Sequence, residues 1–496
     1  MAAMSDALPP LIRTLLDPAR SKLGAARIEL VETHASWVLL AGEFAWKIKK
    51  PIVLPFLDYG TVDKRRAACS AELRLNRRLA PGLYLDVVDF DGEPAVKMRR
   101  FDEAARLDHV CKRGALTPAH LSGLASALAR FHARIAVAPA PTFFGTPARV
   151  LDAALENFTE LRELTRGSLD DELDSLDAWT RAEFARLETT FAARRAAGFI
   201  RECHGDLHLG NLVLLDNQVT PFDAIEFNDD FRWIDVASEI AFTLVDLLDH
   251  GQPGLACWLL NEWLVETGDF DALQVLRFYM TYRALVRAKV AAIRACQRND
   301  AHPADCPEVR DYLALAGAIA VPAAPSQGIP LRITFCITHG VSGSGKTTAS
   351  TRRLLADPRC ATVRLRSDVE RKRLFDLAAL EPSRSPRDGG IYTPEANERT
   401  YARLAELAAA ALDAGWSVIV DAAFLKRAER AAFRAIASAR GLPFAIIECA
   451  ASANELRQRV ASRQGDASEA TVAVLENQLV WDEPLAADEQ AFAVSG

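Results

Sequence analysis

Hydrophobic and polar positions alternate along the chain with two periods, and the period changes at defined places. Residues 35–54 read ASWVLLAGEFAWKIKKPIVL, in which apolar and basic positions alternate on either side of a Gly-Glu pair. This pattern predicts a β-hairpin, and DVVDF and AVKMRRF around an Asp-Gly turn predict another pair of strands, with a helical segment at CSAELRLNRRLA between the two pairs. From about residue 117 to 198 the spacing is mainly helical, so we expect a small β-rich lobe followed by a helical lobe.

The second half of the chain follows a different pattern. Strand-like runs (ITFCITHG, ATVRLRS, WSVIVDAA and PFAIIECAA) alternate with helical runs (TTASTRRLLA, YARLAELAAAALDAG and KRAERAAFRAIASARG). Strands interleaved with helices predict a parallel sheet with crossover helices. Residues 320–330, AVPAAPSQGIP, interrupt the helical periodicity with three prolines and are typical of a linker. We therefore expect one domain over residues 1–322 and a second over residues 331–496.

The composition fits two soluble domains. The chain has 496 residues, 50% hydrophobic and 25% charged, and is too long for one core. Its net charge of -7 argues against nucleic-acid or anionic-membrane binding by the chain as a whole. The nine Cys form no CxxC pair or His-spaced cluster, which predicts neither a zinc site nor a disulfide framework. No apolar run approaches the roughly 18 residues that span a bilayer and no signal segment is recognisable, so we expect a cytoplasmic protein without a membrane partner.

The first cluster of chemical groups lies at residues 201–211, RECHGDLHLGN. Asp206 and Asn211 have the spacing of a kinase catalytic loop, in which Asp accepts the proton of the acceptor hydroxyl and Asn holds Mg²⁺. His204 would hold the loop by hydrogen bonds. The next segment predicts two short strands that deliver Asp223 and Glu226, and Mg²⁺ requires a further oxygen ligand of this kind. A polar turn is the alternative, but so many polar groups between apolar strands would make a poor core.

Two lysines in the predicted hairpin are candidates for anchoring the nucleotide. Lys47 and Lys49 are two positions apart and so lie on one face of a strand, while Glu72 lies in the following helix. A Lys paired with such a Glu anchors ATP phosphates in kinases. The pattern leaves open which lysine is the anchor, and a solvated basic face is the alternative.

These motifs resemble the aminoglycoside phosphotransferase family. HGDLHLGN, the acid-bearing strand and the later acidic helix IDVASEIAF carry the resemblance, which covers roughly residues 30–300. It implies a protein-kinase-like bilobal α+β fold, with Asp206 as catalytic base and Asn211 as a metal ligand. The family has IDF where residues 225–227 read IEF, so Glu226 falls on the usual Asp position, with Asp223 as a competitor.

A later helix bears on the acceptor. RFYMTYRALVRAKVAA gathers two tyrosines and two arginines on one face, namely Tyr279, Tyr282, Arg283 and Arg287. In the resembled family this part of the large lobe faces the acceptor, so a basic, aromatic face would favour an anionic or neutral polar acceptor. A solvated basic face is the alternative.

The second cluster is GVSGSGKT at residues 340–347, which matches GxxxxGK[ST] between an apolar strand and a helix. Lys346 is expected to reach the β- and γ-phosphates and Thr347 to bind Mg²⁺, since backbone N–H groups and a helix N-terminus surround the phosphates there. The nucleotide-binding residues that we predict in this loop are Gly340, Ser342, Gly343, Ser344, Gly345, Lys346, Thr347 and Thr348.

Further charged residues complete a kinase-like set. Asp368 follows a predicted strand and can accept the proton of a hydroxyl, and Asp421 ends another strand and can position Mg²⁺. Arg459 and Arg463 lie one helical turn apart, a spacing suited to covering phosphate charge. Residues 331–485 are similar to small P-loop kinases of the polynucleotide kinase, gluconate kinase and zeta-toxin type, which have an α/β fold.

The combination resembles a family of bacterial bifunctional proteins that join an aminoglycoside phosphotransferase-like domain to a P-loop ATP-binding domain. We predict a phosphotransferase that uses ATP and Mg²⁺ and acts on hydroxyl acceptors, favouring small molecules over nucleic acid. The alternative is a P-loop polynucleotide or nucleoside kinase with a non-catalytic, ligand-sensing N-terminal domain. A nucleic-acid substrate would require a basic groove near Arg366, Arg371 and Arg373.

Overall fold

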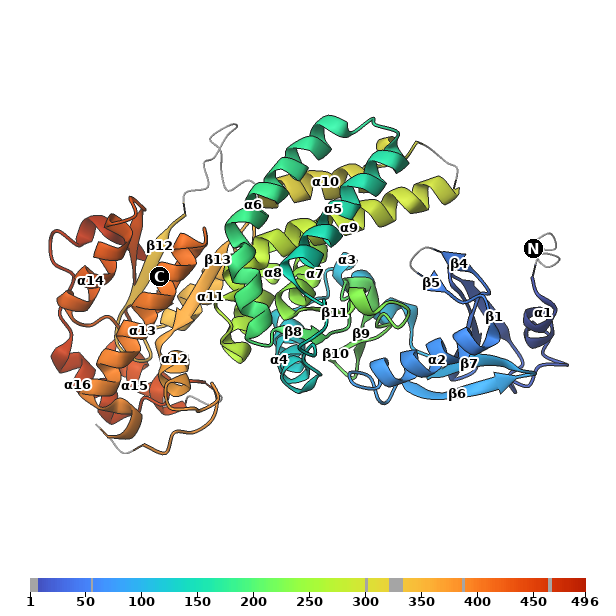
Figure 1. Cartoon of the computed structure of the whole chain (residues 1–496). Helices are drawn as coiled ribbons and strands as arrows, with labels where there is room; N and C mark the ends of the chain where they lie inside the picture. Colours follow the sequence, from blue (N-terminus) through green and yellow to red (C-terminus); the bar gives the residue numbers. More distant parts are fainter. Residues whose placement is uncertain (1–7, 55–56, 299–301, 321–332, 386–388, 463–465) are drawn as a thin grey trace. The chain divides into compact units, whose positions relative to one another are not determined.

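A computed structural model of the chain describes all residues except 1–7, 55–56, 299–301, 321–332, 386–388 and 463–465 (Figure 1). The described residues form two compact units. The first comprises Met1–Val150 and Phe191–Asp246, and the second comprises Leu151–Thr190 and Leu247–Gly496. The greater part of the linker that we predict at residues 320–330 lies outside the described residues.

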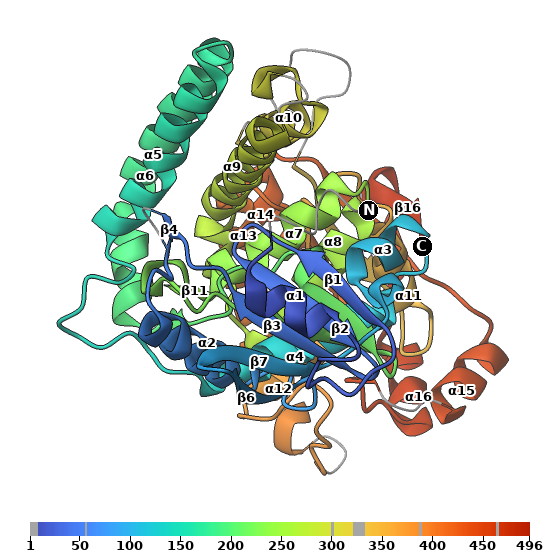
Figure 2. The ribbon, with the colours of Figure 1, turned by 90° about the vertical axis from the view of Figure 1, so that its right-hand side faces the viewer.

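The first unit begins with a five-stranded antiparallel sheet in the order β1-β2-β3-β7-β6. Its strands are β1 (Ile28–Glu32), β2 (Ser36–Ala41), β3 (Phe44–Lys49), β6 (Tyr84–Phe90) and β7 (Glu93–Arg99). Helix α1 (Pro10–Leu16) covers one face, and α2 (Val62–Asn76) packs on the sheet beside β6 and β7 (Figure 2). A short pair, β4 (Val53–Leu54) and β5 (Leu57–Asp58), precedes α2.

Alternation along β3 separates the core from the candidate site. Trp46 and Ile48 pack with Ile12 and Leu15 of α1 in one hydrophobic cluster. Since successive side chains of a strand point to opposite faces, the lysines at positions 47 and 49 lie on the other face, toward α2. The alternation that predicts the hairpin thus also places both lysines.

The remainder of the first unit holds the catalytic-loop motif. Strand β8 (Ile200–Glu202) pairs with β11 (Trp233–Asp235), and β9 (Leu212–Leu215) pairs with β10 (Gln218–Pro221). The turn between β9 and β10 contains Asp216 and Asn217, both with positive φ, as a two-residue hairpin turn requires. The helices are α3 (Leu107–Lys112), α4 (Pro118–Arg134) and the part of α7 (Val236–Asp249) up to residue 246.

The second unit combines helices of the middle of the chain with a second sheet. The helices are chiefly α5 (Pro147–Thr165), α6 (Asp170–Ala196), α8 (Pro253–Thr267), α9 (Ala272–Arg298) and α10 (Pro307–Ala320). In both views α9 and α10 lie side by side (Figures 1 and 2). The sheet has five strands, all parallel, in the order β13-β14-β12-β15-β16.

The strands of this sheet are β12 (Phe335–His339), β13 (Thr362–Arg366), β14 (Ser417–Asp421), β15 (Phe444–Glu448) and β16 (Ala493–Ser495). The helices around it are α11 (Lys346–Leu355), α12 (Ser367–Arg373), α13 (Pro394–Asp413), α14 (Arg427–Ser438), α15 (Ala453–Ser462) and α16 (Val472–Trp481). The parallel sheet with crossover helices is therefore confirmed. In the part of the chain that the structure describes, no helix is long and apolar enough to cross a bilayer.

Candidate functional site

Lys47 lies between two carboxylates in the first unit. Its Nζ is 3.0 Å from Glu72 Oε1 and also donates a hydrogen bond to Asp223. Burial alone would lower the pKa of Lys47, but the carboxylates of Asp223 and Glu72 outweigh it and raise that pKa well above its usual value. The lysine is therefore charged, and it contacts an acid that can also face a metal ion.

Lys49 is enclosed more completely than Lys47. Its Nζ lies 2.7 Å from Glu72 Oε2 and donates to Glu226, and its side chain is 1% exposed against 14% for Lys47. Tyr59 donates to the same Glu226 carboxylate. This arrangement satisfies the charge of Lys49 inside the protein, which leaves Lys47 as the better-placed phosphate anchor.

The two acids that compete for the metal role differ in exposure. The side chain of Asp223 is 40% exposed and that of Glu226 is 6% exposed. Asp223 also has a positive φ of 64°, a conformation that costs energy for a residue other than glycine and is frequent at functional sites. Its backbone N–H donates to Tyr84 Oη at 3.0 Å, and the next N–H donates to Asn76 Oδ1 at 2.9 Å, which fixes this conformation. The geometry favours Asp223 over Glu226 as a metal ligand.

The loop after β8 brings Asp206 and Asn211 together. Asn211 Nδ2 donates to Asp206 Oδ2 at 2.9 Å and to the Asp206 carbonyl at 3.0 Å. His208 Nε2 lies 3.5 Å from Asp206 Oδ2. The amide group of Asn211 thereby orients the carboxylate of Asp206, and its other atom, Oδ1, is of the ligand type that Mg²⁺ prefers.

His204 holds this loop as a neutral side chain. The N–H of Asp206 donates to His204 Nδ1 at 3.3 Å, so the proton is on Nε2, which lies 2.9 Å from the Phe222 carbonyl and donates to it. Burial lowers the pKa of His204, in agreement with this tautomer. The two bonds connect the loop to the segment that leads into Asp223.

Helix α7 supplies a second set of contacts that the sequence pattern did not reveal. Glu239 accepts the backbone N–H groups of His204 at 2.8 Å and Gly205 at 3.0 Å. Further along the same helix, Asp246 accepts the Leu209 N–H at 2.8 Å, and Thr243 donates to the Leu207 carbonyl at 2.6 Å. These three polar positions are spaced by four and three residues in a helix that is otherwise apolar except for Ser238 and Asp249, a signal that could have been read from the sequence.

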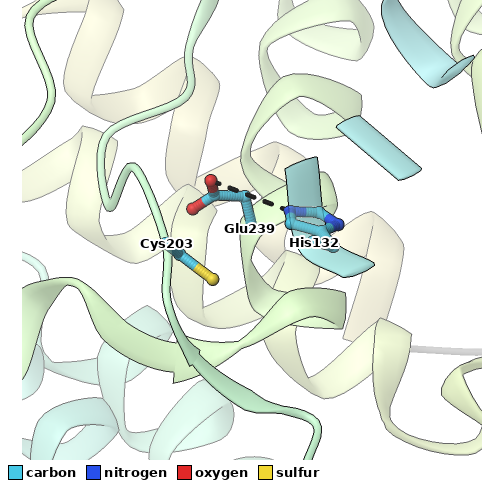
Figure 3. Close-up of side chains that lie close together, drawn as sticks. All are labelled: His132, Cys203 and Glu239. Carbon is cyan, nitrogen blue, oxygen red and sulfur yellow. Dashed lines mark ion pairs between the residues drawn. The ribbon is translucent and has the colours of Figure 1, made fainter. Parts of the chain in front are cut away.

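Glu239 also faces two buried side chains, His132 and Cys203 (Figure 3). His132 Nε2 is 3.9 Å from Glu239 Oε1. Burial would raise the pKa of Glu239, but His132, His204 and the Gly205 N–H outweigh it and lower that pKa to about 2. Because both oxygens already accept backbone N–H groups, we assign this cluster to holding the loop rather than to metal binding.

The P-loop of the second unit has the backbone its motif requires. Gly340, Gly343 and Gly345 all have positive φ, and α11 begins at Lys346, directly after the loop. Lys346 Nζ donates to the Val341 carbonyl at 2.8 Å. The loop residues 342–348 line a cavity, which they share with the two predicted acids Asp368 and Asp421.

Asp421 ends β14 beside α11. Its Oδ2 lies 3.1 Å from Ser350 Oγ, which in turn lies 3.1 Å from the carbonyl of Thr347. Asp368 lies in the first turn of α12 and faces the same cavity. The structure thus brings loop residues 342–348 together with Asp368 and Asp421 around one cavity.

The predicted arginines differ in their positions. Arg459, on α15, donates to the Gly343 carbonyl at 3.3 Å and lines the cavity, whereas Arg463 lies outside the described residues. On α9, Arg283 is buried and Arg287 Nε donates to Tyr312 Oη of α10 at 3.1 Å. These positions favour a packing role for the basic face of α9, and an anionic or neutral polar acceptor stays a prediction.

Comparison with known proteins identifies both halves of the chain. The family model described as phosphotransferase enzyme family matches residues 63–279, and the model described as AAA domain matches residues 335–485. An uncharacterized protein of Mycobacterium tuberculosis (strain ATCC 25618 / H37Rv) is 31% identical over 471 residues, which cover 92% of this chain and 91% of that protein. An uncharacterized protein of Mycobacterium bovis gives the same values.

Solved structures show weaker likeness. A choline/ethanolamine kinase family protein from Mesorhizobium loti is 13% identical with a TM-score of 0.40, over 62% of this chain and 92% of that one. An aminoglycoside phosphotransferase in a ternary complex with streptomycin and ATP is 13% identical with a TM-score of 0.36, over 63% of this chain and 99% of that one.

The fold and the two family matches define a kinase-like phosphotransferase domain followed by an α/β P-loop domain. This confirms the fold class that HGDLHLGN and GVSGSGKT predict. The chain belongs to the family of the two mycobacterial proteins, and it joins both domains in one polypeptide.

Proposed function

We propose that the protein is an ATP- and Mg²⁺-dependent phosphotransferase with two nucleotide sites, one in each kinase-like domain, with the domains divided as we predict, over residues 1–322 and 331–496. The observation that carries the proposal is the position of Lys47, whose ammonium group contacts both Glu72 and Asp223. A charged lysine held by one acid beside a second, exposed acid can bind phosphate while that second acid binds Mg²⁺.

In the first site the residues divide the work of phosphoryl transfer. Lys47 would hold the phosphates, and Asn211 and Asp223 offer the oxygen ligands that suit Mg²⁺. Bound Mg²⁺ would neutralise charge on the β- and γ-phosphates. Asp206 would accept the proton of the acceptor hydroxyl, and its carboxylate is already oriented by Asn211 at 2.9 Å.

In the second site the P-loop has the role that we propose for Lys47 of β3 in the first site. Lys346 and the loop N–H groups would hold the phosphates, with Thr347 and Asp421 toward Mg²⁺. Asp368 would accept the proton of the hydroxyl acceptor, and Arg459 would cover developing phosphate charge. Each of these five residues lines one cavity in the second unit.

We propose small-molecule acceptors rather than nucleic acid. The three arginines that a nucleic-acid groove would need are engaged within the protein. Arg366 Nη2 lies 2.7 Å from Asp466 Oδ1, Arg371 Nη2 lies 2.9 Å from Asn397 Oδ1, and Arg373 Nη2 lies 2.6 Å from the Val265 carbonyl. Guanidinium N–H groups that already donate inside the protein leave fewer donors for a phosphate backbone.

The test is a screen of a metabolite pool with labelled ATP, run on the parent chain and on Asp206→Asn and Lys346→Ala separately. We expect each labelled product to disappear in one variant and persist in the other, which assigns it to a site. If every labelled product persists fully in Asp206→Asn and vanishes in Lys346→Ala, so that no product depends on Asp206, the first domain is a ligand sensor instead. A parallel reaction contains an unlabelled oligonucleotide, and transfer of the label from ATP to it would support the nucleic-acid alternative.

A further inference from the structure

Helix α8 completes the open edge of the second sheet. Strand β13 is at the end of the strand order, so among the described residues one row of its backbone groups has no partner strand. Asn261 of α8 takes the place of such a strand: its Nδ2 donates to the Thr362 carbonyl at 2.9 Å, and its Oδ1 accepts the Arg364 N–H at 2.6 Å. A side-chain amide thus reproduces the pairing of a peptide group.

The side chain of Arg364 continues from this contact into the P-loop helix. Arg364 is 2% exposed, and its guanidinium lies 5.4 Å from the ring centre of Trp258 and 3.6 Å from Glu262, both on α8. On its other side it donates to Thr351 Oγ1 at 2.7 Å and to Ser350 Oγ at 3.4 Å, both on α11. One buried cation therefore joins α8 to α11.

Ser350 extends the connection to the residues proposed to bind Mg²⁺. Its hydroxyl lies 3.1 Å from Asp421 Oδ2 and 3.1 Å from the Thr347 carbonyl. A continuous set of contacts thus runs from Glu262 and Trp258 through Arg364 and Ser350 to Asp421. None of the four residues before Asp421 lines the nucleotide cavity itself.

We propose that α8 is a positioning element of the second nucleotide site and that Arg364 is the residue through which it acts. The inference rests on the proposed function, namely that the P-loop binds Mg²⁺-ATP. Helix α8 shares the second compact unit with the P-loop but lies within residues 63–279, which the phosphotransferase model matches, so on this proposal the P-loop site depends on a helix outside residues 335–485. Because binding linkage is reciprocal, Mg²⁺-ATP at the P-loop should in turn stabilise α8 on β13.

The experiment measures Mg²⁺-ATP binding by the full chain. Binding at the P-loop site is taken as the part of the total that Lys346→Ala abolishes. We expect Arg364→Ala to weaken this part about tenfold and Glu262→Gln about threefold, with Arg364→Lys recovering much of the loss. The difference in ATP affinity between these variants and the parent chain should disappear when Mg²⁺ is replaced by EDTA, because the contacts end at Asp421, which is proposed to bind Mg²⁺. Glu266→Gln, an exposed acid on the same helix, is the matched control.

Hydrogen–deuterium exchange supplies an independent readout. Mg²⁺-ATP should slow exchange in residues 253–267 of the parent chain and of Glu266→Gln, but much less in Glu262→Gln. If Arg364→Ala does not fold, Glu262→Gln and this measurement decide the matter.

Two failures are distinguishable. Lys346-dependent binding that is unchanged in Glu262→Gln and Arg364→Ala, with no effect of nucleotide on exchange in α8, overturns the role of α8 and leaves the proposed function standing. Absence of Lys346-dependent binding in the parent chain overturns the proposed function of this site, and the inference with it.

Discussion

Lys47 Nζ and Glu72 Oε1 lie 3.0 Å apart, and the second oxygen of the same carboxylate lies 2.7 Å from Lys49 Nζ. One acid on α2 therefore holds two lysines of β3. The two pairs differ in exposure, since Lys47 faces Asp223 at the edge of the cluster and Lys49 lies inside it. The difference predicts separate consequences for the two lysines.

Replacement of Lys47 by Met should affect nucleotide use, and replacement of Lys49 by Met should affect stability. Lys47→Met removes the phosphate anchor, so kcat/KM for the Asp206-dependent reaction should fall about 10²-fold. Lys49→Met leaves the buried carboxylate of Glu226 without its cation, so the free energy of unfolding should fall by about 3 kcal/mol. Steady-state kinetics and urea denaturation of both variants check this. If Lys47→Met and Lys49→Met lose activity equally and are equally stable, this division of roles between the two lysines is contradicted.

The exposure of the two candidate metal acids predicts which of them sets the Mg²⁺ requirement. Asp223→Asn should raise the Mg²⁺ concentration for half-maximal activity at least about tenfold, because an exposed carboxylate ligand is lost. Glu226→Gln is the matched control, since Glu226 is bound by Lys49 and Tyr59. It should lower the melting temperature and leave the Mg²⁺ dependence close to that of the parent. The reverse pattern would assign the metal to Glu226.

Glu239 should make the stability of the loop depend on pH. Its pKa is lowered from 4.5 to about 2 in the folded protein, where the favourable contacts of its carboxylate outweigh burial. A lowered folded-state pKa adds stability above the unfolded-state pKa near 4.5 and loses it as the pH falls toward 2. That difference corresponds to about 3 kcal/mol at neutral pH.

The corresponding measurement compares Glu239→Gln with the parent chain by urea denaturation between pH 7 and pH 3. The parent should be the more stable at pH 7, and the gap should narrow below about pH 4.5, because Glu239 then takes up a proton in the unfolded chain while the folded chain keeps it ionised. A gap that stays constant over this range would show that the charge of Glu239 is not what holds His204 and Gly205.

Local patterns account for much of the site, and long-range contacts account for what they missed. Alternation around Lys47 and the spacing from Asp206 to Asn211 are local, so they could be predicted from a few residues. The fixing of Asp223 by Tyr84 and Asn76 depends on residues more than a hundred positions away in the chain, where no local pattern records the contact. The sequence gives only an indirect signal for Arg364, a charged residue at the centre of a predicted strand, and its partners on α8 could be identified only from the fold.

The approach of α8 to α11 predicts opposite outcomes for two helical glycines. A Cβ atom at Gly254, in the first turn of α8, would lie 2.0 Å from the carbonyl oxygen of Leu355, and backbone cannot yield as a side-chain end can. Gly254→Ala should therefore separate α8 from α11, lower the free energy of unfolding by about 2 kcal/mol and weaken Lys346-dependent Mg²⁺-ATP binding.

Gly123, in α4, is the matched control, because a Cβ there meets nothing within 4 Å. Gly123→Ala should raise stability by roughly 0.5–1 kcal/mol, as Ala favours a helix over Gly. Thermal unfolding and nucleotide titration of both variants decide the matter, and a Gly254→Ala chain as stable as Gly123→Ala would mean that α8 does not approach α11 closely in solution.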